Sequence, residues 1–193
     1  MENGRIIRAR ALATALVASG PPLALAQLAD PACTSPEARQ FDFWLGDWTI
    51  EQRILRQDGS YAEFPARTSV RPTAAGCALI EEWRGTVQFF WTGMDAPAEL
   101  HGLSVRAWDP ATHAWVIHWL DDMDPALGEP FVGGFEEGSG TFTRTTTGPD
   151  GVERFSRIRF ERRADGVVEW SLATSRDAGE SWTTLWSMHM TRE

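Results

Sequence analysis

The feature that most constrains the fold is the regular alternation of short strand-like runs with turn sequences rich in Gly and Asp. Within the runs, apolar and polar side chains alternate, as they do in strands with one buried face. The joins favour positive backbone dihedral angles, as at Asp58-Gly59 and Asp165-Gly166. No segment has a sustained helical period, apart from a short turn around residues 35–43. The pattern predicts about ten strands, at residues 48–55, 67–73, 77–84, 100–108, 114–121, 131–136, 141–147, 152–162, 167–175 and 182–191.

Strands that are joined by short hairpins pair in the order in which they occur along the chain. An open sheet of about ten such strands has two exposed edges, which closure into a barrel removes. We therefore expect an all-β fold, namely a single lipocalin-like, antiparallel up-and-down β-barrel. A two-sheet sandwich is the alternative. The long connection at residues 87–99 carries Phe89, Phe90 and Trp91, and it forms either a binding rim or a cover that closes one barrel end.

The amino terminus has the features of a secretory signal. Three arginines within residues 5–10 precede an apolar stretch at residues 11–25, and Ala24-Leu25-Ala26 matches a cleavage site. The apolar stretch is too short and too interrupted by Gly and Pro for a membrane span. We therefore expect a signal peptide at residues 1–26, a polar lead at 27–40 and a barrel domain at 41–193. The mature bacterial protein is then periplasmic or secreted, without stable membrane insertion.

The charge and the aromatic content limit the choice of partners. The chain carries 27 acidic and 18 basic residues, for a formal net charge of −9, which argues against nucleic acid or an anionic membrane surface. It contains 10 Trp and 10 Phe but a single Tyr. This composition predicts a Trp-rich interior that either lines a pocket for a small molecule or fills the core. The sequence does not predict the oligomeric state.

The chain contains two cysteines, Cys33 and Cys77, and both lie after the expected cleavage site. An oxidising compartment favours a disulfide between them. The alternative is a pair of separate buried thiols.

Four motifs together resemble those of the DUF1579 group of secreted bacterial proteins of unknown function. Residues 41–48 read FDFWLGDW, residues 76–83 GCALIEEW, residues 108–121 WDPATHAWVIHWLD, and residues 175–182 SRDAGESW. The resemblance covers about residues 33–193. It implies a lipocalin-like barrel and export, but no established reaction. The cysteines of that group lie before the FDFW opening and in the GC strand, which implies that Cys33 pairs with Cys77.

The motif at residues 175–182 also fits the Asp-box hairpin, which recurs once per blade in propeller glycosidases. A single copy is present here. We therefore expect a structural hairpin in which the Asp177 carboxylate accepts backbone N–H bonds and Trp182 packs beneath.

The period of two also indicates which side chains share a face with the tryptophans. Glu81 lies on the face of Trp83, and Asp121 on the face of Trp119, while His118 takes the opposite face. The expected ligand-binding residues are Trp83, Arg106, Trp108, Trp119 and Trp170, and later strands add Arg157, Arg159 and Arg176. A Glu81–arginine pair inside the barrel is either a ligand-orienting site or a structural ion pair. The candidate catalytic residues are Glu81, His118 and Asp121, because a carboxylate near a histidine or an arginine can act as acid and base.

No metal or cofactor is expected. The four histidines, at positions 101, 113, 118 and 189, show none of the paired spacings typical of metal sites. His189 lies near the carboxyl end, as does the haem ligand of nitrobindin barrels, but the other signatures of that group are missing.

Three functions remain open from the sequence. The first is an exported barrel that binds a small apolar or aromatic molecule. The second is an enzyme that uses acid–base chemistry inside the barrel, and the third is a structural envelope module with a filled core. An open apolar pocket favours binding, an unpaired Glu or His in a pocket favours catalysis, and a filled interior favours the structural module.

Overall fold

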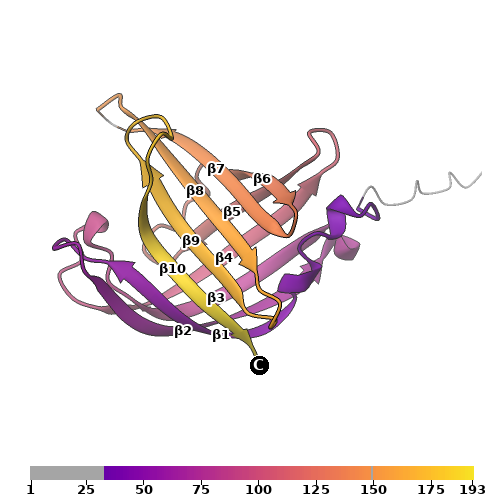
Figure 1. The fold of residues 1–193 in the computed structure, drawn as a ribbon, viewed down its shortest axis with the longest axis horizontal. Coiled ribbons are helices and arrows are strands. Elements are labelled where there is room, and N and C mark those ends of the chain that lie inside the picture. Colours follow the sequence, from indigo (N-terminus) through magenta and orange to yellow (C-terminus); the bar gives the residue numbers. More distant parts are fainter. Residues whose placement is uncertain (1–32, 149) are drawn as a thin grey trace, which may run out of the picture.

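The computed structural model describes residues 33–148 and 150–193, which form ten antiparallel strands closed into a barrel (Figure 1). Each strand pairs with the next one along the chain, and the last pairs with the first. The predicted all-β, up-and-down barrel is therefore confirmed, and the sandwich is excluded because the sheet closes. The expected signal peptide at residues 1–26 lies outside the described residues. The strands are β1 (Gly46–Leu55), β2 (Tyr61–Thr73), β3 (Ala78–Val87), β4 (Ala98–Asp109), β5 (Ala114–Asp121), β6 (Phe131–Glu136), β7 (Ser139–Thr147), β8 (Glu153–Arg162), β9 (Val168–Ser175) and β10 (Thr183–Arg192).

The strand boundaries differ most from the predicted ones in β2. This strand begins at Tyr61 instead of Arg67, because its pairing with β1 continues until Tyr61 lies opposite Leu55. Pro65 lies in the additional part and weakens the strand signal, since proline has no backbone N–H to donate. In the barrel its side chain is exposed and the residue lies opposite Glu51.

The alternation of side chains along each strand decides which of them face the interior. Four buried residues form the inward row of β1: Trp48, Ile50, Gln52 and Ile54. Gln52 is polar, but its amide is satisfied on both sides. Its Nε2 donates to the Thr86 carbonyl at 2.7 Å, and its Oε1 accepts from the Trp186 indole at 2.6 Å. Such pairing makes a buried amide tolerable in an otherwise apolar row.

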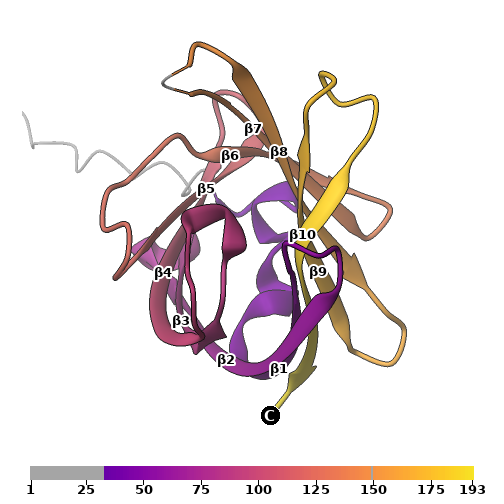
Figure 2. The same ribbon diagram turned by 90° about the vertical axis from the view of Figure 1, so that its left-hand side faces the viewer.

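One end of the barrel is closed by the segment that precedes β1. This segment, residues 33–45, is called the plug here, and Figure 2 shows its short helical turns inside the ring of strands. It contains two 3-10 helices, η1 (Glu37–Arg39) and η2 (Asp42–Trp44). Phe41 is fully buried and its ring packs edge-on against Trp115 and Phe160, at centroid distances of 4.9 and 5.3 Å. Aromatic packing therefore fills this end of the interior.

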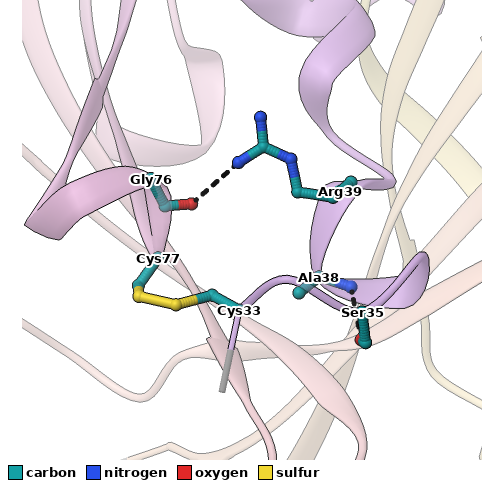
Figure 3. Close-up of a disulfide and its surroundings, with 6 residues drawn as sticks. All are labelled: Cys33, Ser35, Ala38, Arg39, Gly76 and Cys77. Atoms are coloured by element: carbon teal, nitrogen blue, oxygen red, sulfur yellow. Dashed lines mark hydrogen bonds between the residues drawn. A yellow bond between two sulfur atoms is a disulfide. The ribbon is translucent and has the colours of Figure 1, made fainter. Parts of the chain in front are cut away.

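Covalent and polar contacts hold the plug against the barrel wall. Cys33 forms a disulfide with Cys77, which lies just before β3, with 5.0 Å between their Cα atoms (Figure 3). Nearby, Nη1 of Arg39 donates to the carbonyl of Gly76 at 3.5 Å. The disulfide predicted from the sequence is thus present, and it joins the start of the plug to the turn that precedes β3.

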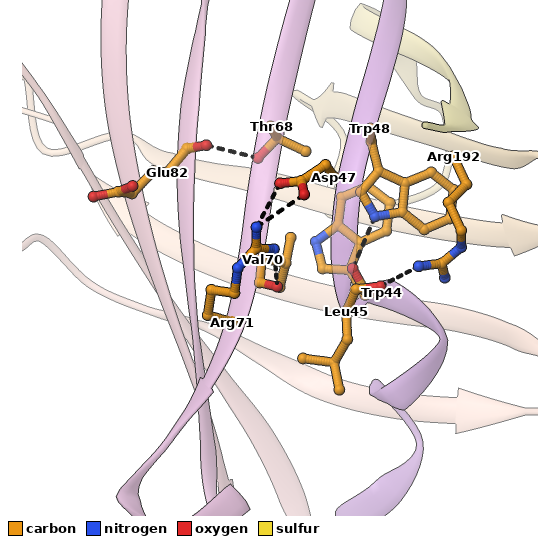
Figure 4. A network of polar contacts seen from close by, with 9 residues as sticks. All are labelled: Trp44, Leu45, Asp47, Trp48, Thr68, Val70, Arg71, Glu82 and Arg192. Atoms are coloured by element: carbon orange, nitrogen blue, oxygen red, sulfur yellow. Dashed lines mark hydrogen bonds and ion pairs between the residues drawn. The ribbon is translucent and has the colours of Figure 1, made fainter.

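The last strand also contributes to this closed end. Arg192, near the end of β10, donates from Nη1 to the carbonyl of Leu45 (Figure 4). Its Nη2 donates to the carbonyl of Phe43 at 2.6 Å. Its guanidinium lies 4.4 Å from the centroid of the Trp48 ring. The Trp48 indole donates in turn to the Trp44 carbonyl at 2.9 Å. The carboxyl-terminal strand therefore helps to fix the backbone of the plug.

The opposite end is covered by the connection between β3 and β4, residues 88–97, which we call the lid. It contains the 3-10 helix η4 (Phe90–Thr92). Phe89 is buried, stacks on Trp91 at 4.8 Å and meets Trp186 of the wall edge-on at 5.1 Å. The segment covers its barrel end, as one of the two interpretations expected, and Phe89 and Trp91 also line the interior.

The turn before β10 forms the expected structural hairpin. The Asp177 carboxylate accepts hydrogen bonds from the backbone N–H of Ser181 at 2.8 Å and from its hydroxyl at 2.5 Å. Ser175 donates to the same carboxylate at 2.7 Å. These bonds, those to Ser181 first, lower the pKa of Asp177 from its ordinary value of 3.8 to about 2. Trp182 closes the turn by donating to the Gly179 carbonyl at 2.9 Å.

In the part of the chain that the structure describes, no helix combines the length and the apolar character needed to cross a membrane.

Candidate functional site

A partly open cavity of about 170 Å³ lies between the plug and the lid. Its walls are mainly aromatic and aliphatic, and most of its aromatic side chains come from the half of the barrel near the lid. The polar lining residues are few: Glu81, Ser104, Arg106, Asp121 and Arg144. Its position inside the barrel and this mixture of walls make it the candidate site.

A buried ion pair forms one side of the cavity. Nη2 of Arg106 lies 2.5 Å from Oε2 of Glu81, and the two residues are 4% and 5% exposed. They project inward from adjacent strands, since Glu81 is opposite Ser104 and Arg106 follows two residues later on β4. The hydroxyl of Thr68 lies within 2.9 Å of the second carboxylate oxygen. Close pairing offsets the large cost of removing both charges from water.

The guanidinium of Arg106 is also surrounded by aromatic rings of the plug and the far wall. Its central carbon lies 5.3, 5.8 and 5.6 Å from the ring centroids of Phe41, Trp44 and Phe160. Contacts of a cation with ring faces are favourable when water is excluded. The plug therefore fixes the position of the arginine at the base of the cavity.

Tryptophans form the wall nearest the lid. Trp186 meets Trp83 edge-on at 5.5 Å and Trp170 edge-on at 5.3 Å, and Trp119 meets Trp83 at 6.2 Å. Trp119 lies over Gly102 of the neighbouring strand, where any Cβ atom would overlap the indole. These edge-to-face contacts make a rigid aromatic surface that can face a second aromatic ring.

Arg144 is the second arginine of the cavity. It lies two residues after the buried Phe142 on β7, so it faces inward with it. Its guanidinium carbon is 4.4 Å from the centroid of the Phe131 ring, and Nη1 donates to the carbonyl of Glu129 at 3.4 Å. Burial lowers the pKa of Arg144. No ion pair links it to a carboxylate in the described ranges.

Asp121 lies at the end of β5, where the chain turns into the connection to β6. One oxygen accepts from the Trp119 indole at 2.8 Å. The other accepts from the backbone N–H groups of Met123 at 2.9 Å and Asp124 at 2.8 Å. The carboxylate therefore orients an aromatic wall residue and caps a turn.

The structure brings together most of the residues that were singled out from the sequence. Trp83, Arg106, Trp119, Trp170, Glu81 and Asp121 all line the cavity. Trp108 does not, because it lies near the plug, where its ring is 6.0 Å from that of Trp115. His118 has the opposite strand parity to Trp119 and faces outward, so it does not approach Glu81.

Other predicted arginines also lie outside the cavity. Arg157 and Arg159 have the outward parity of β8, and Arg176 lies in the exposed β9–β10 turn. The residues predicted from the sequence did not include Arg144 and Trp186, and Phe89 was named only as part of the long connection at residues 87–99. Arg144 follows Phe142 by two residues on the same strand, so the period of two would have placed both side chains inside the barrel. Trp186 shares the parity of the buried Met188 and Met190 on β10, so the same alternation would have placed it inside.

The histidines and carboxylates do not gather around a metal position. Within residues 33–148 and 150–193, no group of three or more His, Cys, Asp or Glu side chains could hold an ion. His189 is on the outer face and its Nδ1 lies 2.9 Å from the Glu169 carboxylate. Its side chain therefore points away from the barrel interior, where a haem ligand would have to lie.

A larger hollow of about 780 Å³ lies on the outer face of β2–β5, lined by charged side chains such as Arg67, Glu82 and Arg84. Water reaches these side chains, so the hollow lacks the apolar enclosure typical of small-molecule sites.

The ten-stranded up-and-down architecture with an internal cavity is that of a lipocalin-like barrel. No protein-family model matches the chain, and no curated protein matches it. Its function must therefore be argued from the geometry of the cavity.

Proposed function

We propose that this protein is an exported lipocalin-like barrel that binds one small aromatic or apolar molecule between the plug and the lid. The observation that carries the proposal is the internal cavity of about 170 Å³ with aromatic walls and a few polar groups. Such a combination is typical of small-molecule sites. The motifs at residues 41–48 and 76–83 support membership of the DUF1579 group and export, and they imply no reaction.

The volume of the cavity limits the size of the ligand. An apolar cavity of roughly 150 Å³ holds one benzene molecule. A cavity of about 170 Å³ therefore suits a single ring with one small substituent. The long hydrocarbon chains that larger barrels take up would not fit without displacement of the lid.

The lid end also provides an apolar entrance. Phe90 and Trp91 on the lid are each 38% exposed. Met123 and Leu127, on the connection between β5 and β6 at the same barrel end, are 48% and 63% exposed. Apolar side chains around the mouth favour the approach of an apolar molecule, and a small displacement of the lid would admit it.

The other two functions have weaker support. Aromatic side chains of the plug pack inside one end of the barrel, as a structural module requires, but a cavity remains between the plug and the lid. For acid–base catalysis, both oxygens of Glu81 already accept hydrogen bonds, and His118 faces outward. The Glu81–histidine pair that such catalysis would use is therefore not assembled.

Two substitutions at one position test the binding function. Ser104 is 1% exposed and lines the cavity. Ser104→Leu fills the space, whereas Ser104→Ala leaves it open. We expect toluene and phenol to raise the Tm of the natural protein and of Ser104→Ala, but not that of Ser104→Leu. Equal shifts in all three proteins, or none in any of them, would contradict binding in this cavity.

Export has its own test. After expression of the full chain in a Gram-negative host, the protein should be recovered from the periplasm with Gln27 as its first residue. An unprocessed chain that stays in the cytoplasm would contradict the export proposal without affecting the binding proposal.

A further inference from the structure

Some of the polar atoms that line the cavity have hydrogen-bond partners and others have none. Those without a partner are mainly hydrogen-bond donors. Within the described part of the chain, several buried cavity-lining atoms have no hydrogen-bond partner: Trp44 Nε1, Trp83 Nε1, Ser104 Oγ, Arg106 Nε and Nη1, and Arg144 Nε. Indole and guanidinium nitrogens can only donate, whereas the serine hydroxyl can also accept. Buried polar groups in native proteins nearly always have partners. The cavity therefore calls for a molecule that supplies acceptors.

The acceptors of the cavity are, in contrast, already engaged. Glu81 accepts from Arg106 at 2.5 Å, and the Thr68 hydroxyl lies 2.9 Å from its other oxygen. Both oxygens of Asp121 accept hydrogen bonds from Trp119 and from its own turn. A ligand rich in donors would find few free partners here. The imbalance selects for acceptor-bearing molecules.

The charges lead to the same conclusion. Arg106 is neutralised by Glu81, whereas in the described structure Arg144 makes a cation–π contact with the Phe131 ring and a hydrogen bond to the Glu129 carbonyl but no ion pair. Burial lowers the pKa of Arg144, as expected for a cation that has lost water without gaining an anion. An anionic group near Arg144 would compensate that loss, and hydrogen bonds to charged partners are stronger than neutral ones.

Building on the proposed binding function, we infer that the cavity takes a small aromatic carboxylate. Its ring lies against Trp83, Trp119 and Trp186, and its carboxylate accepts hydrogen bonds from the unpaired donors of Arg106 and Arg144. The two arginines approach the cavity from neighbouring parts of the wall. Arg106 is opposite Ile117, Ile117 is opposite Phe131, and Phe131 is in contact with Arg144.

Three compounds of nearly the same shape show how the charge of a ligand affects its binding when its size is held constant. Benzoate, benzamide and benzamidine are planar single rings with an anionic, a neutral and a cationic substituent. We expect isothermal titration calorimetry to show benzoate binding at least tenfold more tightly than benzamide, with no binding of benzamidine. Quenching of the tryptophan fluorescence should follow the same order, because the ring would lie among the indoles.

Two arginine substitutions test the role of Arg144. Arg144→Gln should weaken benzoate binding by about tenfold to a hundredfold, as expected for a lost charged hydrogen bond, and weaken benzamide binding less, because the amide carbonyl carries no charge. Arg157→Gln is the matched control, since Arg157 lies 4.1 Å from the Trp182 ring but has the outward parity of β8. It should change neither affinity.

The outcomes distinguish this inference from the proposed function. If benzamide binds as tightly as benzoate, or if Arg144→Gln has no effect on benzoate, the carboxylate inference is wrong and the binding function stands. Benzamidine as the tightest ligand would also overturn it. If none of the three compounds nor toluene binds, the proposed function itself fails. Loss of benzoate binding in Ser104→Leu would show that the compound occupies the cavity.

Discussion

At the residue scale, the stability of the barrel depends on how Glu81 and Arg106 neutralise each other. Glu81 is 5% exposed and Arg106 is 4% exposed, and Nη2 of Arg106 lies 2.5 Å from Oε2 of Glu81. A lone charge in such a place is costly, whereas a paired charge is tolerated and a well-packed apolar pair can be equally stable. The main effect of the pair is therefore that neither buried charge is left unpaired, and its net contribution to stability over an apolar pair is small.

Removal of one partner should be far more damaging than removal of both. We expect Arg106→Met to lower the free energy of unfolding by about 3–5 kcal/mol, because Glu81 is left unpaired. The double substitution Glu81→Met with Arg106→Met should recover most of that loss. Urea denaturation at pH 7 measures both. A double variant that is less stable than Arg106→Met would show that the charges themselves stabilise the barrel.

Gly102 offers a second prediction at this scale. A Cβ atom there would overlap the Trp119 indole, so Gly102→Ala must displace a wall residue of the cavity. We expect a loss of about 1–3 kcal/mol in the free energy of unfolding, together with a changed tryptophan emission spectrum. Gly134→Ala on β6, where a Cβ meets nothing within 4 Å, is the control and should leave the spectrum unchanged.

At the scale of the element, the hairpin between β9 and β10 should respond to acid. The pKa of Asp177 is lowered to about 2 by hydrogen bonds from Ser181 and Ser175 in the folded turn. Because the folded pKa lies below the unfolded one, the ionised carboxylate stabilises the turn above about pH 4, and this contribution is lost as the pH falls towards 2.

The amide resonance of Ser181 reports this titration directly, since its N–H donates to the Asp177 carboxylate. Its chemical shift should move with a midpoint near pH 2 in the natural protein. In Asp177→Asn the shift should be flat between about pH 4 and 2, because the group that titrates is gone. A midpoint near 4 in the natural protein would mean that the hydrogen bonds of the turn do not form in solution.

At the scale of the whole molecule, the disulfide links the plug to the turn that precedes β3 across 44 residues of chain. In the chain-entropy description, a loop of this length contributes about 4 kcal/mol at most. We expect the double substitution Cys33→Ser with Cys77→Ser to lower the free energy of unfolding by about 2–4 kcal/mol. Urea denaturation of the oxidised and the substituted proteins gives the difference.

The barrel itself should survive this change, because the pairing of β1 with β10 and the burial of Phe41 do not involve the cysteines. Far-ultraviolet circular dichroism should therefore be unaltered. Loss of the β-sheet signal in the double variant would mean that the plug is required for closure.

The sequence predicted the fold well because the relevant signals are local. Turn residues and alternation located all ten strands, and the same alternation placed Glu81, Arg106 and Trp119 on inward faces. It failed where position depended on distant parts of the chain. Trp108 shares the inward parity of Arg106, but the plug occupies its end of the barrel, so it does not reach the cavity.

The sequence by itself therefore determined which segments are strands and which side chains point inward, since both follow from the period of two and from turn chemistry. Only the tertiary structure decided what the interior contains. The end of the barrel into which the plug packs and the meeting of Arg106 and Arg144 at one cavity depend on register and side-chain volume around the whole ring. These quantities are set by residues far apart in the chain, so no local pattern encodes them.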